Sequence, residues 1–583
     1  MLALLERRIP LVRLLRHYPR HLLRGDVTAG LTTAVMLIPQ AMAYAALAGM
    51  PPITGLYASI VPIAVYALLG TSGSLAFGPV AIVSLLTASA VAPLADGDPA
   101  TYVALAGALA LMVGAIQLVL GVLRLGVVVD LLSHSVISGF TSAAALIIAT
   151  SQLRALTGIS AEGGDTFLAE ATAILGAVAD LHPATLTVGL ASIVLLVVLK
   201  RRSRRFPGPL AVVVVMTTLA VVLGLADRGV ALLGAVPSGF PAPGLPAVGV
   251  DQLQALLVPA LTIALLSFME GISVAKAIAS RTGSRVDSTQ ELLASGAANL
   301  SAGLFQAFPV AGGFSRTAVN FQAGARTPLA SLITAGMVLL SVLLLTPLFT
   351  NLPKAVLAAI VVVAVAGLVD VAGATHAWRT DRWDFAMLAI TFVATLALGV
   401  EIGIGVGVAS SLVLLTARSA RPHITELGLV SETGQYRNVA RFPTRTDPRV
   451  LLVRVDGALL FANAQTVTRR LEAMAAARGP ELEAVVLDAA AVADIDGDGV
   501  HVLDELERTL EARSVAMHLA TVRGPVRDAL TRADRWRRWV DAGRVHEDVE
   551  AALRHLGIRL AAAAAADAEV ASDVRPEVAP DRG

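Results

Sequence analysis

Long uncharged stretches dominate the first 417 residues of the chain. The first, from Val27 to Ala95, contains no Asp, Glu, Lys or Arg and is long enough for three membrane crossings of about 20 residues each. Since each crossing needs one such apolar run, the pattern predicts a polytopic α-helical membrane domain, which we place at residues 25–420. Charge-poor stretches continue along this region at 99–123, 131–153, 181–199, 206–226, 229–269, 292–315, 327–353, 355–369, 385–400 and 402–417.

After Arg418 the chain becomes charged and alternates between two periodicities. Apolar runs at 450–455, 457–464, 484–492 and 515–522 are typical of strands, and the stretches 466–479, 499–513 and GPVRDALTRA are typical of helices. We therefore predict one compact α/β domain over residues 438–557. The remaining segments are an amphipathic, arginine-rich N-terminus (1–24), a linker (421–437) and a tail that is poor in large apolar residues and is predicted to be disordered (558–583).

Composition excludes several classes of function. The chain has 583 residues, of which 56% are hydrophobic and 15% charged, so one soluble domain is excluded. A net charge of +1 is too small to produce the strong positive electrostatic field that attracts nucleic acid. Without cysteine there are no disulfides or thiolate metal sites. The sequence has no Walker motif and no soluble catalytic constellation, so we expect a protein that is not an enzyme and needs no cofactor or bound metal.

The charged residues between apolar stretches indicate the orientation of the membrane domain. Lys and Arg concentrate in the cytoplasmic loops of membrane proteins. A count of fourteen spans places all the basic clusters on one side and the acidic loops on the other, so both termini are expected in the cytoplasm. The basic clusters lie in 7–24, 200–205, 281–285, 379–382 and 418–421, and the acidic loops in 96–98 and 162–180.

Two apolar stretches are interrupted in the same way. LAFGPVAIVSLLT (75–87) contains Gly78-Pro79, and AFPVAGGFSRTAVN (307–320) contains a similar Pro and Gly break. Matching interruptions in two halves of a membrane protein indicate an inverted-repeat transporter in which two half-helices meet near the midplane. The N-termini of such half-helices carry free N–H groups and the positive end of the helix dipole, which suit an anion.

A few polar residues stand in apolar surroundings. Gln40 and Tyr44 lie one turn apart beside Pro39, Glu270 lies in SFMEGISVAKAIA, and Arg316 follows the second break. Such residues normally face a cavity or a partner, and Glu270 could carry H⁺ or coordinate Na⁺. The alternatives are helix packing for Gln40, an interfacial position for Arg316 and a purely structural Glu270–Arg316 ion pair.

The ordered motifs LIPQAMAYAALAGMPPITGLYASIVP, FGPVAIVSLLT, SFMEGISVAKAIA and GGFSRTAVN resemble the SulP family of sulfate permeases, and the α/β domain resembles a STAS domain. The resemblance implies fourteen spans in two inverted seven-span repeats, a core and a gate domain, and a homodimer. It also implies Glu270 as the ion-coupling acid of the eighth span. The implied substrate-binding residues are Gln40, Tyr44, Ala81, Ser84, Phe314, Ser315 and Arg316.

The α/β domain contains a misleading calcium pattern. Asp494, Asp496, Asp498, Gly499 and Glu505 match positions of an EF-hand loop, but the preceding segment is a strand where an EF-hand needs a helix, so we do not predict calcium binding. In STAS domains the same loop resembles DSSG with a phosphorylatable serine. Gly497 occupies the position of that serine, which places phosphoregulation in doubt.

These features predict a secondary active inorganic anion transporter of the bacterial cytoplasmic (inner) membrane, with sulfate:H⁺ symport as the first choice. Na⁺-dependent bicarbonate uptake is the main alternative, followed by anion exchange and dicarboxylate uptake. A membrane anion sensor that signals to a cytoplasmic partner through the STAS domain is an alternative of another class.

Overall fold

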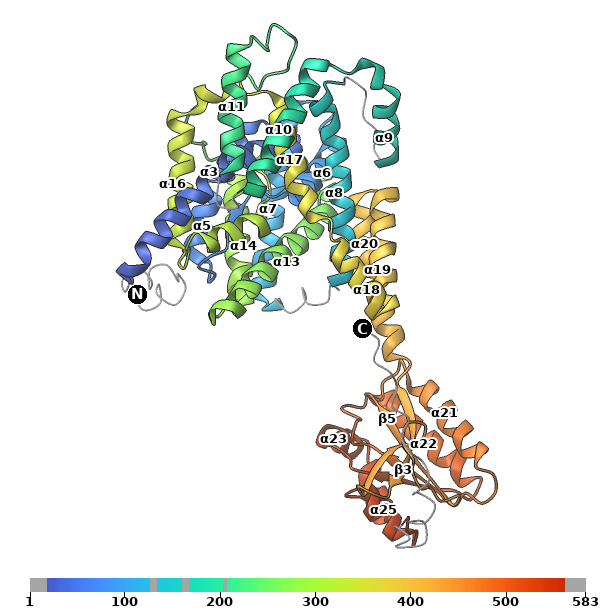
Figure 1. Ribbon diagram of the computed structural model, residues 1–583. Coiled ribbons are helices and arrows are strands. Elements are labelled where there is room, and N and C mark those ends of the chain that lie inside the picture. Colours follow the sequence, from blue (N-terminus) through green and yellow to red (C-terminus); the bar gives the residue numbers. More distant parts are fainter. Residues whose placement is uncertain (1–17, 126–133, 160–166, 203–206, 561–583) are drawn as a thin grey trace. The chain divides into compact units, whose positions relative to one another are not determined.

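The computed structural model describes residues 18–125, 134–159, 167–202 and 207–560, so most of the predicted N-terminal segment and tail lie outside the described residues. The chain forms two compact units, 1–411 and 412–583 (Figure 1).

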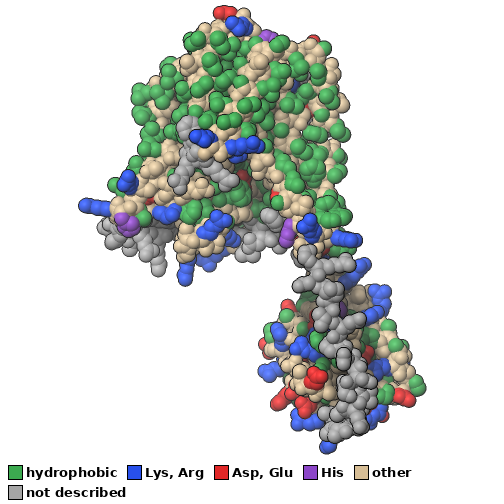
Figure 2. All heavy atoms as spheres, viewed as in Figure 1, with side chains coloured by type: hydrophobic (Ala, Val, Ile, Leu, Met, Phe, Trp, Pro, Cys, Tyr) green, Lys and Arg blue, Asp and Glu red, His purple; other side chains and the backbone are tan. Residues whose placement is uncertain are grey.

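The first unit is almost entirely helical, as the apolar runs predict. Eight described helical stretches are long and apolar enough to cross a membrane, and four shorter apolar helices accompany them. Two of the eight join consecutive α-helices (Pro52–Leu69 and Lys354–Thr380), and the last is α20, which extends past residue 411. The count of fourteen spans therefore stays a prediction. Hydrophobic side chains spread over the visible face of this unit (Figure 2). The helices are α3 Leu23–Leu47, α4 Pro52–Tyr57, α5 Val61–Leu69, α6 Ala81–Val91, α7 Pro99–Val122, α8 His134–Thr157, α9 Phe167–Gly176, α10 Pro183–Arg202, α11 Gly208–Val222, α12 Val250–Ala255, α13 Leu257–Thr282, α14 Ser288–Leu304, α15 Phe314–Gln322, α16 Leu329–Leu344, α17 Lys354–Val365, α18 Val371–Thr380, α19 Arg382–Leu398 and α20 Val400–Ser419.

Helices α7 and α14 pack closely against each other over an extensive contact, and glycines make that approach possible. A Cβ atom added to Gly296 on α14 would lie 2.9 Å from the carbonyl oxygen of Gly114 on α7, which is too close for any other residue. Small residues at helix interfaces let backbones approach in membranes, where packing contributes much of the stability. The α7–α14 pair is therefore a rigid support for the segment that follows α14.

Two buried carboxylates hold the segments on either side of the helical breaks. Asp26 accepts hydrogen bonds from the backbone N–H groups of Arg326 and Thr327 at 2.8 and 3.1 Å. Glu291 accepts from the N–H groups of Thr71 and Ser72 at 2.7 and 3.0 Å. Because hydrogen bonds from fixed donors compensate the loss of hydration of a buried carboxylate, these two residues fix the backbone near both half-helices.

The second unit is a six-stranded sheet in the order β4-β3-β5-β6-β7-β8, with parallel pairing from β5 to β8 and antiparallel pairing at β3. Its elements are β3 His423–Val430, β4 Gln435–Asn438, β5 Val450–Asp456, α21 Ala464–Ala477, β6 Ala484–Asp488, α22 Gly497–Glu511, β7 Ala516–Ala520, α23 Gly524–Arg532, α24 Arg535–Asp541, β8 Val545–His546 and α25 Val549–His555.

Helices cover both faces of this sheet, because alternate residues of its central strands face opposite sides. Leu451 and Val453 of β5 join a core with α21 to α24, whereas Val450 and Leu452 join a core with α25. Strands that are buried on both faces have continuous apolar sequences, which explains why the sequence pattern identified the central strands of this sheet.

Two details of this unit differ from the sequence pattern. Residues 423–438, which the pattern assigned mainly to a linker, form strands β3 and β4 of the sheet. The predicted strand at 457–464 was wrong, because this segment is a loop that leads into α21. The Asn463 side chain accepts from the N–H of Leu460 at 3.0 Å and donates to the carbonyl of Ala458 at 2.8 Å, which closes the backbone into turns.

Three histidines cluster where β7, β8 and α25 meet. His518 is buried, its Nδ1 lies 2.9 Å from Nε2 of His546, and the ring of His555 lies 5.1 Å from that of His546. Burial, followed by the neighbouring histidines and Arg544, lowers the pKa of His518 to about 4. Burial and His555 also lower the pKa of His546. The folded domain therefore holds neutral rings where the unfolded chain would bind protons.

We expect the stability of this unit to fall as the pH falls from about 6.5 towards 4. A histidine whose folded pKa lies below its unfolded value binds protons preferentially when unfolded, so its stabilising contribution is complete above pH 6.5 and is lost on acidification. After allowance for partial solvent screening, the loss is on the order of 2 kcal/mol. Urea unfolding of the isolated 420–560 fragment at several pH values measures it.

The matched variants are His518→Gln, which removes the buried titrating ring, and His501→Gln on the exposed face of α22. We expect the first to flatten the pH profile of the unfolding free energy and the second to leave it unchanged. A profile that stays equally steep in His518→Gln would contradict this assignment.

Candidate functional site

The two interrupted segments of the sequence meet in the structure. The short strands β1 (Phe77–Gly78) and β2 (Ala311–Gly312) pair antiparallel, and helices α6 and α15 begin directly after them. Within the described residues no side chain caps either helix. The first N–H groups of both helices therefore have no intrahelical partner, and they lie close together at one place in the membrane domain.

Buried side chains hold these half-helices in place. The Asn299 carboxamide of α14 bonds both backbone groups of Val310, at 2.8 Å from its N–H and 3.1 Å from its carbonyl oxygen. On α15, Oγ1 of Thr317 accepts from the N–H of Ala76 at 3.0 Å, and the Asn320 amide donates to the carbonyl of Ser74 at 2.9 Å. Since each bond joins one break to another part of the domain, the two helix N-termini are held relative to each other.

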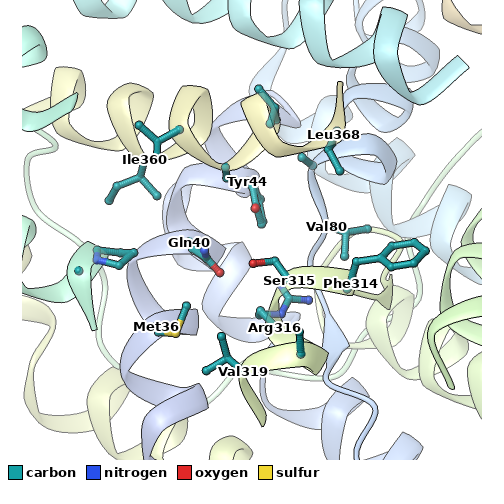
Figure 3. Close-up of a pocket in the computed structure, with 18 of the residues that line it drawn as sticks. Met36, Gln40, Tyr44, Val80, Phe314, Ser315, Arg316, Val319, Ile360 and Leu368 are labelled. Carbon is teal, nitrogen blue, oxygen red and sulfur yellow. The ribbon is translucent and has the colours of Figure 1, made fainter. Parts of the chain in front are cut away.

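A cavity of about 350 Å³ lies beside the half-helices (Figure 3). The side chains of Gln40, Tyr44 and Ser315 point into the same space, whereas the Phe314 ring points away from it. Helices α10, α11 and α17 supply the other walls. The lining residues are Met36, Gln40, Tyr44, Val80, Ala81, Ile82, Leu196, Lys200, Gly208, Pro209, Glu270, Gly313, Phe314, Ser315, Arg316, Ala318, Val319, Gln322, Ile360, Val363, Ala364, Val365 and Leu368.

Several polar atoms of this lining are buried and unpaired. The Arg316 side chain, only 4% exposed, donates through Nη1 to the carbonyl of Pro79. Its Nε and Nη2 atoms and the Oε1 atom of Gln40 have no hydrogen-bond partner in the described part of the chain. A buried donor without a partner costs about 1–3 kcal/mol, and more if charged. A bound anion would satisfy the guanidinium donors.

Glu270 of α13 lines the same cavity. Its Oε2 atom is buried without a hydrogen-bond partner, and no ion pair joins it to Arg316 among the described residues. The structural ion pair that the sequence left open is therefore absent from this conformation. An unpaired carboxyl group in apolar surroundings is suited to exchange a proton.

The structure gathers six of the seven predicted binding residues and Glu270 around this cavity. Ser84 is the exception: its hydroxyl donates to the carbonyl of Val80 at 2.9 Å and does not line the space. Sequence reasoning missed Lys200 and the apolar wall from Ile360 to Leu368. Nothing in the local pattern of these residues distinguishes them from other helix positions, because only tertiary packing brings them to the site.

The acidic loop of the second unit has a structural role. Asp496 accepts from the N–H groups of Gly499 and Phe461, both at 2.8 Å, and caps α22. Gly497 is the first residue of that helix, and an added Cβ would meet nothing within 4 Å. The position therefore has room for a serine that this chain does not carry.

Comparison with known proteins agrees with this architecture. The model of the sulfate permease family matches residues 23–391, and that of the STAS domain matches residues 441–552. The chain belongs to the sulfate permease family. Its fold class, a polytopic helical membrane domain followed by a STAS domain, is thereby confirmed, and so is the prediction of a transporter rather than an enzyme.

Two relatives cover nearly the whole chain. A probable sulfate transporter of Mycobacterium tuberculosis is 39% identical over 519 residues, which is 89% of this chain and 92% of the relative. The chloroplastic sulfate transporter 4.1 of Arabidopsis thaliana is 37% identical over 553 residues, 91% of this chain and 80% of the relative.

Two solved structures share the fold. The murine Solute Carrier 26 family member A9 anion transporter, in an inward-facing state, superposes with a TM-score of 0.89 at 25% identity and covers 95% of both chains. The transmembrane domain of the cyanobacterial bicarbonate transporter BicA has a TM-score of 0.59 at 26% identity, with coverage of 66% of this chain and 97% of that one. This permease is therefore a multi-pass membrane protein for the transport of anions.

Proposed function

We propose that this permease is a secondary active transporter that moves sulfate together with H⁺. The observation that carries the proposal is the pair of uncapped half-helix N-termini beside the unpaired donors of Arg316. Two relatives that cover nearly the whole chain are named as sulfate transporters, which favours sulfate over other anions.

In the proposed mechanism the anion binds between α6 and α15. Backbone N–H groups at Ala81 and Ser315, the Ser315 hydroxyl and the Arg316 guanidinium surround its oxygens, and Gln40 and Tyr44 form the facing wall. Preorganised donors need no rearrangement to stabilise the charge, and a low-dielectric site strengthens each interaction. Binding therefore satisfies the two Arg316 donors, Nε and Nη2, that are otherwise buried without partners.

Glu270 supplies the coupling in this proposal. Sulfate carries two negative charges, so a loaded site with an ionised Glu270 would hold more negative than positive charge in the membrane domain. A proton on Glu270 removes one negative charge, which lowers the cost of moving the loaded core past the gate. Proton and anion therefore cross together.

We also propose that both termini lie in the cytoplasm. Lys and Arg near span ends are enriched on that side, and Arg24, Arg281 and Arg285 are exposed near the ends of α3 and α13.

The test is uptake of ³⁵S-sulfate into proteoliposomes that contain the purified protein. We expect accumulation that requires an inward H⁺ gradient and does not depend on Na⁺. Protein-free liposomes are the control for leakage. Absence of sulfate movement in folded protein would overturn the proposal, and a sensor would bind sulfate without moving it.

Na⁺-dependent bicarbonate uptake is the second candidate, favoured by the similarity of the membrane domain to the bicarbonate transporter BicA. Uptake of ¹⁴C-bicarbonate into the same proteoliposomes, measured with and without an inward Na⁺ gradient, distinguishes the two candidates.

A further inference from the structure

One positively charged residue of the cavity wall, Lys200, lies outside the half-helices and has no part in the proposed coupling by Glu270. Lys200 lies in the last turn of α10 and lines the cavity together with Leu196, which is one helical turn earlier on the same face. Gly208 and Pro209 at the start of α11 continue this wall. The wall therefore faces the half-helices from a different part of the membrane domain.

Lys200 lines the cavity, whereas the basic residues next to it in the sequence do not. Arg201 and Arg202 follow it in the same last turn and are also exposed, yet neither lines the cavity. A basic residue at the end of a membrane helix commonly extends to the interfacial water, which is a sufficient explanation for the two arginines. It does not explain why Lys200 borders the space that receives the anion.

The chemistry of Lys200 complements that of Arg316. Arg316 is buried and bonded to the carbonyl of Pro79, so it provides a fixed, desolvated charge. Lys200 is exposed. Its ammonium group lies on a flexible side chain and can attract an anion while both the ammonium group and the anion stay hydrated. Such a group raises the local concentration of anions at the entrance of a cleft without holding them tightly.

We propose that Lys200 is the recruiting residue of the cytoplasmic entrance, which draws oxyanions into the cavity and favours divalent over monovalent ones. The inference rests on the proposed transport function. Attraction to a single positive charge doubles with the charge of the anion, so Lys200 adds preference for sulfate over bicarbonate before either reaches the half-helices. At physiological ionic strength, salt weakens the interaction between exposed charges over a screening distance of about 8 Å. The preference for sulfate therefore decreases as ionic strength rises.

The experiment compares Lys200→Gln with wild type in inside-out and right-side-out membrane vesicles, with ³⁵S-sulfate as the probe. In inside-out vesicles, where the cytoplasmic face is accessible, we expect the KM for sulfate to rise about 3- to 10-fold with little change in maximal rate. The salt dependence of KM should flatten, and right-side-out vesicles should show the wild-type KM. Lys200→Arg should restore the wild-type behaviour.

Arg202→Gln is the matched control, because it removes one positive charge two residues away without touching the cavity wall. An unchanged KM in Lys200→Gln, or an equal rise in Arg202→Gln, would overturn the role of Lys200 while wild-type transport continues. If wild-type vesicles move no sulfate, the proposed function fails, and the inference fails with it.

Discussion

Replacement of Arg316 by glutamine is expected to lower sulfate uptake about 100-fold. Arg316 is the charged side chain at the half-helix N-termini, and two of its nitrogens have no partner in the described residues. Removal of one preorganised donor from a desolvated anion site costs about 2.7–4 kcal/mol. Glutamine keeps a polar N–H group that can still donate to the carbonyl of Pro79, so the change tests the charge more than the packing.

Uptake of ³⁵S-sulfate into proteoliposomes measures this effect, with equal amounts of monodisperse protein for each variant. Arg316→Lys keeps the charge without the fork of donors and should give an intermediate rate. Arg326→Gln is the control, because Arg326 is an exposed arginine just after α15 that does not line the cavity. Uptake by Arg316→Gln at the wild-type rate would show that the anion binds elsewhere.

The second large effect concerns coupling. Glu270→Gln is expected to abolish sulfate accumulation driven by a pH gradient while leaving sulfate–sulfate exchange intact. Glutamine has the shape and neutrality of a protonated glutamate but cannot release a proton. The loaded site of this variant can therefore still cross, but its movement no longer depends on the pH difference.

Two assays on the same vesicles separate these steps: accumulation under an inward H⁺ gradient, and exchange of internal for external sulfate at equal pH. Glu270→Asp keeps the ionisable group and should retain part of the accumulation. Loss of both activities in Glu270→Gln would indicate a structural role. Accumulation at the wild-type level would exclude Glu270 as the coupling acid.

Local sequence features predicted much of the architecture. The apolar runs identified most of the membrane helices, because a span must satisfy its own backbone and present apolar side chains to lipid. The paired Pro and Gly breaks identified the half-helices, because a proline removes an N–H group and a glycine permits an abrupt change of backbone direction. Gln40, Glu270 and Arg316 were recognisable because polar groups are costly in apolar surroundings unless a cavity or partner receives them.

Other features depended on contacts between distant segments. The apolar wall of α17 and the position of Lys200 in the cavity follow from how α10 and α17 pack against the half-helices, which no local periodicity encodes. Ser84 had the right position in a motif, but its hydroxyl bonds its own helix. The loop at 457–464 has the composition of a strand, but the hydrogen bonds of Asn463 close its backbone into turns.

The sequence by itself therefore determined the class of protein, its two domains and most of the polar residues that line the candidate site, because membrane burial and helix breaks impose strong local constraints on residue type. Only the tertiary structure decided that Arg316 and Glu270 share one cavity without forming an ion pair in the described part of the chain. Their separation depends on the packing of α13 against β2 and α15, and packing is set by the shapes of many side chains together.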